Sequence, residues 1–112
     1  MSKNKETNIQ NRAIVHCSDI AYLWNYTVGK FYTLDARLVT VGVPGFPDVF
    51  GFRKSDGKFI VLEFKTEKGK LREDQVQFQK SVAKNNISII YGVPRSVEDA
   101  KRIILEGENN AL

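Results

Sequence analysis

Two carboxylates and one lysine stand at the ends of two strand-like segments in the middle of the sequence. Residues 45–65 read GFPDVFGFRKSDGKFIVLEFK, in which Asp48 follows Pro47 and Glu63 stands two positions before Lys65. Proteins hold hard divalent cations such as Mg²⁺ with one or two carboxylates, waters and substrate phosphate. Such an ion makes a bound water nucleophilic near neutral pH, and a nearby ammonium stabilises the negative charge that develops. The three residue types therefore indicate metal-assisted phosphodiester hydrolysis.

The same three residues also have ordinary structural explanations. Glu63 and Lys65 could form an ion pair at a strand end, and Asp48 after a proline could begin a turn. Their geometry decides between the interpretations. Strand side chains alternate between faces, so Glu63 and Lys65 share one face with Val61.

The Asp56-Gly57 pair predicts a two-residue hairpin turn between the two strands. With that turn, Asp48 lies opposite Lys65 and diagonal to Glu63 on one face of the sheet. Cross-strand neighbours are then roughly 4.5–8 Å apart, close enough for two carboxylates to share a cation. A shift by one residue would move Asp48 to the other face.

Two further polar residues fall where apolar ones are expected. Glu6 heads a helical stripe that continues at residues 9, 13 and 17, and Gln75 lies between Leu71 and Phe78 on one helical face. A glutamate in a first turn often compensates the helix dipole, and a glutamine at a core edge often only fills hydrogen bonds. Together with Asp48 and Glu63, they favour a polar site.

The elements that must position these residues follow from periodicity and turn signals. We expect an α/β sandwich with a central mixed sheet flanked by helices, because the order is helix, strand, hairpin, helix, strand, helix. Trp24 falls in register with the first helical stripe, and the Ser96 side chain should cap the last helix. The expected segments are a helix from residue 6 to between 18 and 23, a strand over 24–35 with a turn at Gly29, an irregular segment over 36–47, strands over 48–52 and 58–64, a helix over 68–86, a strand over 87–93 and a helix from 96 that stops at Gly107.

Composition bounds the class of protein. The 112 residues suffice for one domain, whose ends at 1–5 and 108–112 we expect to be loose, and the 42% hydrophobic content excludes a disordered chain. The single Cys17 has no disulfide partner, the first twelve residues have no secretory pattern, and no apolar run is long enough to span a membrane. A soluble protein of the cytoplasm is expected. The net charge of +4 suits a polyanionic partner, although many proteins without one share it.

The quoted residues also carry a resemblance to a known family. Pro47-Asp48, followed by Glu63-Phe64-Lys65, resembles the PD-(D/E)XK nuclease signature. The longer context of Glu6, GFPD, EFK, GKL and Gln75 is similar to the virus-type replication-repair nuclease (VRR-NUC) domain in its compact, stand-alone, phage-like form. The likeness extends over residues 6–105 and implies a restriction-endonuclease-like α/β sandwich.

The resemblance implies a role for each motif residue. Asp48 and Glu63 would bind Mg²⁺ or Mn²⁺ with the backbone carbonyl of Phe64, and Glu6 would support the metal. Lys65 would orient the attacking water or stabilise the phosphate, and Gln75 would position the lysine or the water. It further implies a homodimeric endonuclease for branched DNA, similar to Holliday-junction resolvases and encoded by a phage in a bacterial host.

DNA contacts are less specific in the sequence. Basic residues flank the motif and could neutralise phosphates, although each could equally be a solvated loop charge. Three aromatic residues could stack on bases, form a dimer interface or belong to the core, and His16 has no partner at metal-ligand spacing. The basic candidates are Lys54, Lys58, Lys68, Lys70 and Arg72, and the aromatic ones are Tyr26, Phe31 and Tyr32.

Three other functions stay open at this stage. The chain could be a nuclease for flaps or nicks, a nucleic-acid-binding module that has lost catalysis, or an assembly protein with a fortuitous motif. Divalent cations discriminate the metal-dependent endonuclease from the binding module, because carboxylates repel phosphate unless a cation intervenes. A pure binding module should bind equally well in EDTA.

Overall fold

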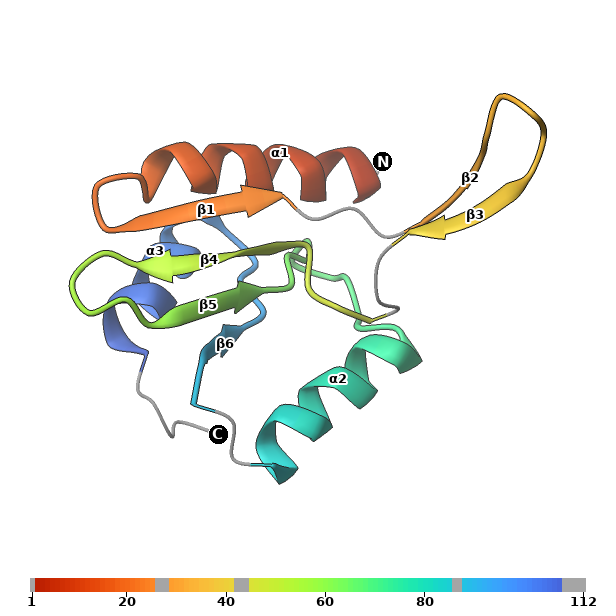
Figure 1. Cartoon of the computed structure of the whole chain (residues 1–112). Helices are drawn as coiled ribbons and strands as arrows, with labels where there is room; N and C mark the ends of the chain where they lie inside the picture. Colours follow the sequence, from red (N-terminus) through yellow and green to blue (C-terminus); the bar gives the residue numbers. More distant parts are fainter. Residues whose placement is uncertain (1, 26–28, 42–44, 86–87, 108–112) are drawn as a thin grey trace.

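The structure of the chain is a computed structural model, and it describes residues 2–25, 29–41, 45–85 and 88–107. Figure 1 shows a central sheet with helices on both sides and a separate two-stranded arm. The α/β sandwich that the sequence predicts is confirmed. No helix among these residues is long and apolar enough to cross a membrane.

The central sheet has four strands in the order β1-β4-β5-β6. These strands are β1 (Ala21–Asn25), β4 (Val49–Arg53), β5 (Phe59–Leu62) and β6 (Ile90–Gly92). β4 pairs antiparallel with both β1 and β5, whereas β5 pairs parallel with β6. The sheet is therefore mixed, and α2 connects its two parallel strands.

Three helices cover the sheet. α1 (Ser2–His16) and α3 (Val97–Glu106) lie together on one face, and α2 (Glu73–Lys84) lies on the other. The side chain of Ser96 caps α3 by accepting the backbone N–H of Asp99 at 3.0 Å, as the sequence predicts. Gly107 ends α3 at the expected position.

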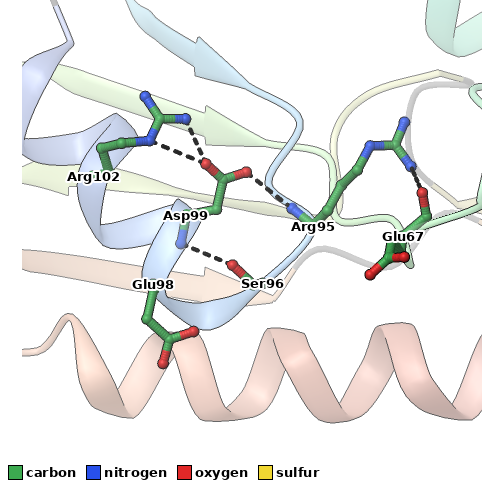
Figure 2. A pocket seen from close by; sticks show the side chains of 6 residues that line it. All are labelled: Glu67, Arg95, Ser96, Glu98, Asp99 and Arg102. Carbon is green, nitrogen blue, oxygen red and sulfur yellow. Dashed lines mark hydrogen bonds and ion pairs between the residues drawn. The ribbon is translucent and has the colours of Figure 1, made fainter.

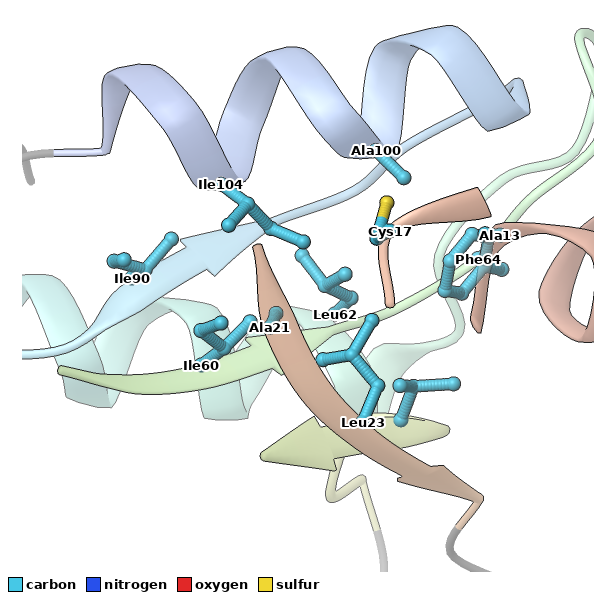
Figure 3. Close-up of a cluster of buried hydrophobic side chains, with 11 residues drawn as sticks. Ala13, Cys17, Ala21, Leu23, Ile60, Leu62, Phe64, Ile90, Ala100 and Ile104 are labelled. Carbon is cyan, nitrogen blue, oxygen red and sulfur yellow. The ribbon is translucent and has the colours of Figure 1, made fainter. Parts of the chain in front are cut away.

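The main core lies between the sheet and the pair α1 and α3. Figure 3 shows Ile60, Leu62 and Phe64 pointing from β5 and its extension toward these helices. They meet small side chains from the helices, including Ala13 and Ala100, so the helices approach the sheet closely. This face of β5 is wholly apolar, which leaves the opposite face for residues 59, 61, 63 and 65.

The first helix differs from its expected bounds. It begins at Ser2, so residues 2–5 are helical rather than loose, and it ends at His16. Trp24, which falls in the helical register, instead lies in β1, because the chain turns back at residues 17–20. The backbone N–H groups of Ile20 and Ala21 both donate to the Cys17 carbonyl at 2.9 Å, closing this turn.

A two-stranded arm occupies residues 29–41, so its second strand lies in the first part of the segment over 36–47 that was expected to be irregular. Residues 42–44 of that segment lie outside the described residues. β2 (Gly29–Tyr32) pairs antiparallel with β3 (Leu38–Val41), so Gly29 begins a strand and is not its turn. The connection closes where the Thr33 N–H donates to the Arg37 carbonyl at 2.8 Å. Figure 1 shows this arm projecting from the rest of the fold.

The β4–β5 hairpin has a longer loop than the sequence predicts. The Arg53 N–H donates to the Lys58 carbonyl at 2.8 Å, and the Gly57 N–H donates to the Arg53 carbonyl at 2.8 Å. The loop is therefore residues 54–57, and Gly57 adopts a left-handed φ of 75°. Phe52 consequently pairs with Phe59, so the predicted register is wrong by two residues.

An error of two residues leaves every side chain on its predicted face, because strand side chains alternate with a period of two. Continuing the observed register beyond β4 puts Asp48 opposite Glu63 and makes Lys65 its diagonal neighbour. The prediction that Asp48 lies opposite Lys65 is therefore corrected. The prediction that all three share one face is kept.

Candidate active site

Glu63 and Lys65 continue the sheet beyond the last residue of β5. Their backbone N–H groups donate to the carbonyls of Gly92 and Pro94 at 3.0 and 3.2 Å. These bonds hold the two residues in extended conformation, so both side chains stay on the face of Val61, beneath α2. Glu63 is 2% exposed and Lys65 is 5% exposed, an unusual degree of burial for charged side chains.

Asp48 reaches the same place from the segment before β4. Its Oδ2 accepts the backbone N–H of Phe64 at 3.2 Å, which ties the aspartate to the strand that carries Glu63 and Lys65. Pro47 before it is fully buried, and Gly45 takes a left-handed φ of 83° against the first turn of α2. The GFPD segment therefore fixes Asp48 at the edge of the site.

Gln75 completes the cluster from α2. Its Nε2 donates to Oε2 of Glu63 at 2.8 Å, while its Oε1 accepts the backbone N–H of Arg72 at 2.7 Å. The same Oε2 of Glu63 lies 3.7 Å from Nζ of Lys65. The structure thus brings together four sequence-predicted residues, Asp48, Glu63, Lys65 and Gln75.

The environment of Glu63 favours its protonated form. Burial, followed by the neighbouring carboxyl group of Asp48, raises the pKa of Glu63 to about 9, and Lys65 opposes this only in part. The charge of Glu63 adds to burial in raising the pKa of Tyr91 to about 12. Tyr91 on β6 is therefore close to the site, and no sequence pattern indicated this.

The donor set fits a hard divalent cation. Oε1 of Glu63 is buried without a hydrogen-bond partner among the described residues, and the Asp48 carboxyl lies beside it. A cation could replace the proton on Glu63, because metal binding displaces protons from its ligands. Within the part of the chain that the structure describes, no three or more His, Cys, Asp and Glu side chains cluster as metal ligands. Asp48 and Glu63 could hold such a cation together with waters, and the family resemblance adds the Phe64 carbonyl.

Glu6 is not part of this cluster. It lies in the first turns of α1, which packs on the face of the sheet opposite Glu63. The nearby Lys5 and Ile9 line a hollow with Thr66, Glu67, Lys68 and Arg95, so the start of α1 borders the segment that follows Lys65. Its role in metal binding stays a prediction that these contacts do not test.

The predicted DNA-contacting residues lie in two places, three of them in the segment after Lys65 and two at the far end of the β4–β5 hairpin. Lys68 and Lys70 are exposed in the segment between Lys65 and α2, and Arg72 pairs with Asp74 at 3.4 Å. At the far end of the β4–β5 hairpin, Lys54 donates to the Ser18 carbonyl at 2.7 Å, while Lys58 is half-buried.

Arg95 organises the segment that follows Lys65. Its Nη1 donates to the carbonyls of Thr66 and Gly69 at 2.6 Å and to that of Glu67 at 3.4 Å. Figure 2 shows this guanidinium at one side of a surface hollow of about 430 Å³, with Asp99 bound to Arg102 at the other. These ion pairs and loop contacts are structural, and sequence reasoning missed Arg95 because its partners are 26 to 29 residues away.

The remaining candidates lie elsewhere. Tyr26 is outside the described residues, Phe31 belongs to β2, and Tyr32 is exposed on the arm. Cys17 is a buried core residue whose pKa is raised by burial, so its thiol is unsuited to act as a nucleophile.

An α/β sandwich with a buried glutamate, a neighbouring aspartate and a buried lysine at the end of its central strands defines a nuclease-like protein of the PD-(D/E)XK type. The family model of the VRR-NUC domain matches residues 3–93, and the chain belongs to that family. The family resemblance inferred from the sequence is thereby confirmed. No curated protein matches the chain.

Proposed function

We propose that the protein is a Mg²⁺- or Mn²⁺-dependent endodeoxyribonuclease that hydrolyses phosphodiester bonds in branched DNA. The observation that carries this proposal is the buried cluster of Glu63, Lys65 and Gln75 beside Asp48, on one face of the sheet. Burying ionisable groups costs free energy, so clusters of this kind occur preferentially at functional sites. The VRR-NUC family, which consists of nucleases, supports the same class of reaction.

Asp48 and Glu63 would hold the cation together with the carbonyl of Phe64, and Glu6 would support it through water. A bound divalent ion supplies polarisation of the phosphate and a lowered pKa of a bound water. The protein's own contribution is to present two carboxylates at fixed positions. The Phe64 N–H holds Asp48, and the Gln75 amide holds Glu63.

Lys65 would supply positive charge where the phosphate becomes more negative, or would orient the attacking water. Lys65 is buried, and its Nζ lies 3.7 Å from Oε2 of Glu63, so the ammonium is held beside the proposed metal ligand. Gln75 would position Glu63 and Lys65, because its amide is held in turn by the Arg72 N–H at the start of α2.

We propose a four-way junction as the preferred substrate and a homodimer as the active form, with residues 1–112 acting as one catalytic unit. A four-way junction presents two equivalent strands, and a two-fold dimer offers two matched sites. Flanking basic residues would contact the phosphates, namely Lys54, Lys58, Lys68, Lys70 and Arg72. The likeness to phage-like stand-alone members supports a phage-encoded enzyme acting in the cytoplasm of a bacterial host.

The test is a cleavage panel of junction, flap, nicked duplex, plain duplex and single strand, each with and without Mn²⁺. Asp48→Asn and Glu63→Gln should lower the rate by at least about a hundredfold, because either change removes a charged metal ligand. Glu106→Gln is the matched control, because Glu106 is exposed on α3. Circular dichroism checks that the variants are folded.

Each other outcome selects a different function. Faster cleavage of flap or nicked DNA, with a monomeric mass by light scattering, would replace the junction with a flap- or nick-type substrate. Binding that is equal in EDTA and Mn²⁺, with no cleavage of any substrate, would make the chain a catalytically inactive binding module. Cleavage that survives in folded Asp48→Asn and Glu63→Gln variants would overturn the proposed site.

A further inference from the structure

One half of the catalytic face of the sheet carries exposed aromatic side chains. We call Tyr22 and Trp24 of β1, Phe52 of β4 and Phe59 of β5 the aromatic face. Their exposed fractions are 53%, 48%, 38% and 41%. On the other half, Phe78 of α2 contacts Phe46 and Tyr91, so α2 covers that part of the face. The aromatic face is the part of the sheet that α2 does not cover.

The two rings on β1 are neighbours with nearly parallel planes. The centroids of Tyr22 and Trp24 are 6.5 Å apart and their planes differ by 20°. The spacing is that of residues i and i+2 along a strand, so both rings stand side by side on the same face with nearly parallel planes. Phe52 lies beside both rings, at 5.3 Å from Tyr22 and 6.0 Å from Trp24.

Positive charge adjoins these rings. Nζ of Lys54 lies 4.4 Å from the centroid of Tyr22, a cation–π contact. A groove that combines aromatic rings with basic side chains is the usual way in which proteins bind single-stranded nucleic acid. The charge on this face therefore complements a phosphate backbone.

The aromatic face is also continuous with the candidate active site. Phe59 and Glu63 lie on the same face of one extended segment, four residues apart, or about 13 Å at the rise of a strand. Phe52 and Asp48 are related in the same way along the neighbouring strand. A DNA strand with its scissile phosphate at Glu63 could therefore reach the rings within a few nucleotides.

We propose that the aromatic face binds unpaired bases of the DNA substrate by stacking on its exposed rings, principally Tyr22 and Trp24. This inference rests on the proposed function, because it extends the substrate of the same site. Such stacking would favour DNA with unpaired bases, such as a flap, over an intact duplex, and a fully paired four-way junction would use it only where the branch point opens.

A second copy of the chain fits these observations less well. A buried aromatic side chain accounts for roughly 150–250 Å². The four rings, each about half exposed, thus offer only a few hundred Å². A standard protein interface buries about 800 Å² on each partner. Lys54 beside the rings and the net charge of +4 also favour a polyanion over a like-charged copy.

Trp24 is the single tryptophan of the chain and reports on its own contacts. Titration of the wild-type protein in EDTA with an oligothymidylate should quench its fluorescence. An oligonucleotide of equal length in which every base is replaced by an abasic site keeps the phosphates but lacks the rings. It should bind at least about fivefold more weakly, as expected when one stacked base is lost, and a blunt duplex should not quench.

Variants separate stacking from apolar contact. Trp24→Leu and Tyr22→Leu keep apolar bulk but remove the π face, so each should weaken binding of a labelled oligothymidylate at least about fivefold by anisotropy. Trp24→Phe should retain most of the affinity. Leu105→Ala, at an exposed position on α3, is the matched control. Circular dichroism confirms that each variant is folded.

Equal binding of the abasic and base-bearing oligonucleotides would overturn the inference, as would unchanged affinity of the folded Trp24→Leu and Tyr22→Leu variants. A drop from dimer to monomer in Trp24→Leu, by light scattering, would instead assign the aromatic face to self-association. Cleavage by the wild type is measured separately. Loss of base-dependent binding with retained cleavage refutes only this inference, and base-dependent binding without any cleavage refutes only the proposed function.

Discussion

The carboxyl group of Glu63 is buried next to a second carboxyl group. Lys65 lies 3.7 Å away, but Gln75 also occupies the same oxygen of Glu63, and the other oxygen has no hydrogen-bond partner among the described residues. A buried carboxyl group that lacks sufficient countercharge takes up a proton. The proton therefore lies where the proposed function requires a cation.

The metal-free protein should lose stability as the pH rises. The ordinary pKa of Glu63 is 4.5, and the folded protein raises it to about 9. Between these values the folded state holds a proton that the unfolded chain releases, so the free energy of unfolding falls with increasing pH. Urea denaturation in EDTA at several pH values across this interval measures the slope.

Glu63→Gln should flatten that slope, because the amide stays neutral at every pH. Adding Mn²⁺ to the wild type should raise stability most at the alkaline end, where the ion competes with the fewest protons. Glu106→Gln, an exposed change, should keep the slope of the wild type. A slope that Glu63→Gln leaves unchanged would mean that Glu63 is already ionised in the folded state.

At the scale of elements, the β4–β5 hairpin separates what the sequence can predict from what it cannot. Alternation predicts that Asp48, Glu63 and Lys65 share a face, and the structure agrees. The register was wrong because Asp56-Gly57 suits a two-residue turn and equally a four-residue loop that closes on a left-handed Gly57. The two-residue pattern cannot distinguish these loops, because the contacts that stabilise one of them lie elsewhere in the structure.

Those contacts come from distant parts of the chain. Arg53 pairs locally with Asp56 at 2.6 Å, but its Nη1 donates to the distant carbonyls of Ile104 and Gly107 at the end of α3. Such bonds span about fifty residues and leave no local periodicity. The arm strand β3 was missed for a related reason, because the glycines and prolines that follow it in the sequence suggested an irregular segment.

The GFPD turn depends on a close approach between Gly45 and α2. A Cβ atom at Gly45 would lie 2.4 Å from the Asp74 carbonyl oxygen, and the residue has a left-handed φ of 83°. Gly45→Ala should therefore destabilise the fold by more than the roughly 1–2 kcal/mol that a left-handed conformation alone costs an L-residue. Thermal or urea denaturation measures the difference.

Gly57→Ala supplies the matched control for this effect. Its φ of 75° is also left-handed, but a Cβ atom there would meet nothing within 4 Å. It should therefore show only the conformational cost. Because Gly45 fixes the turn before Asp48, Gly45→Ala should also slow cleavage, whereas Gly57→Ala should not. Equal destabilisation by the two variants would argue against the close packing of GFPD on α2.

At the scale of the whole molecule, the two faces of the central sheet have different roles: one forms the core and the other carries the candidate active site. The face toward α1 and α3 is an apolar core. The opposite face carries the candidate active site, α2 and the aromatic face. The sequence indicates this division, because Ile60, Leu62 and Phe64 alternate with Val61, Glu63 and Lys65. It does not indicate that α2 leaves half of the catalytic face uncovered, which depends on how the helix is placed by Gln75 and Phe78.

The net charge of +4 gives a last prediction, on DNA binding. Each lysine that neutralises a phosphate of duplex DNA contributes roughly 0.9 to the slope of log K against log salt concentration. Lys68 and Lys70 are exposed in the segment after Lys65. Arg95 holds the backbone of this segment in place through its carbonyl groups. Lys68→Ala and Lys70→Ala should therefore each lower the slope by about 0.9, with weaker binding to every duplex regardless of sequence.

Fluorescence anisotropy with a labelled duplex in EDTA, over a series of salt concentrations, measures these slopes. Lys84→Ala is the matched control, because Lys84 is equally exposed but ends α2, at the opposite end of the helix from Gln75. It should leave the slope unchanged if DNA lies across the candidate active site. An equal loss of slope in all three variants would mean that the positive charge acts diffusely, without a binding path that passes Lys65.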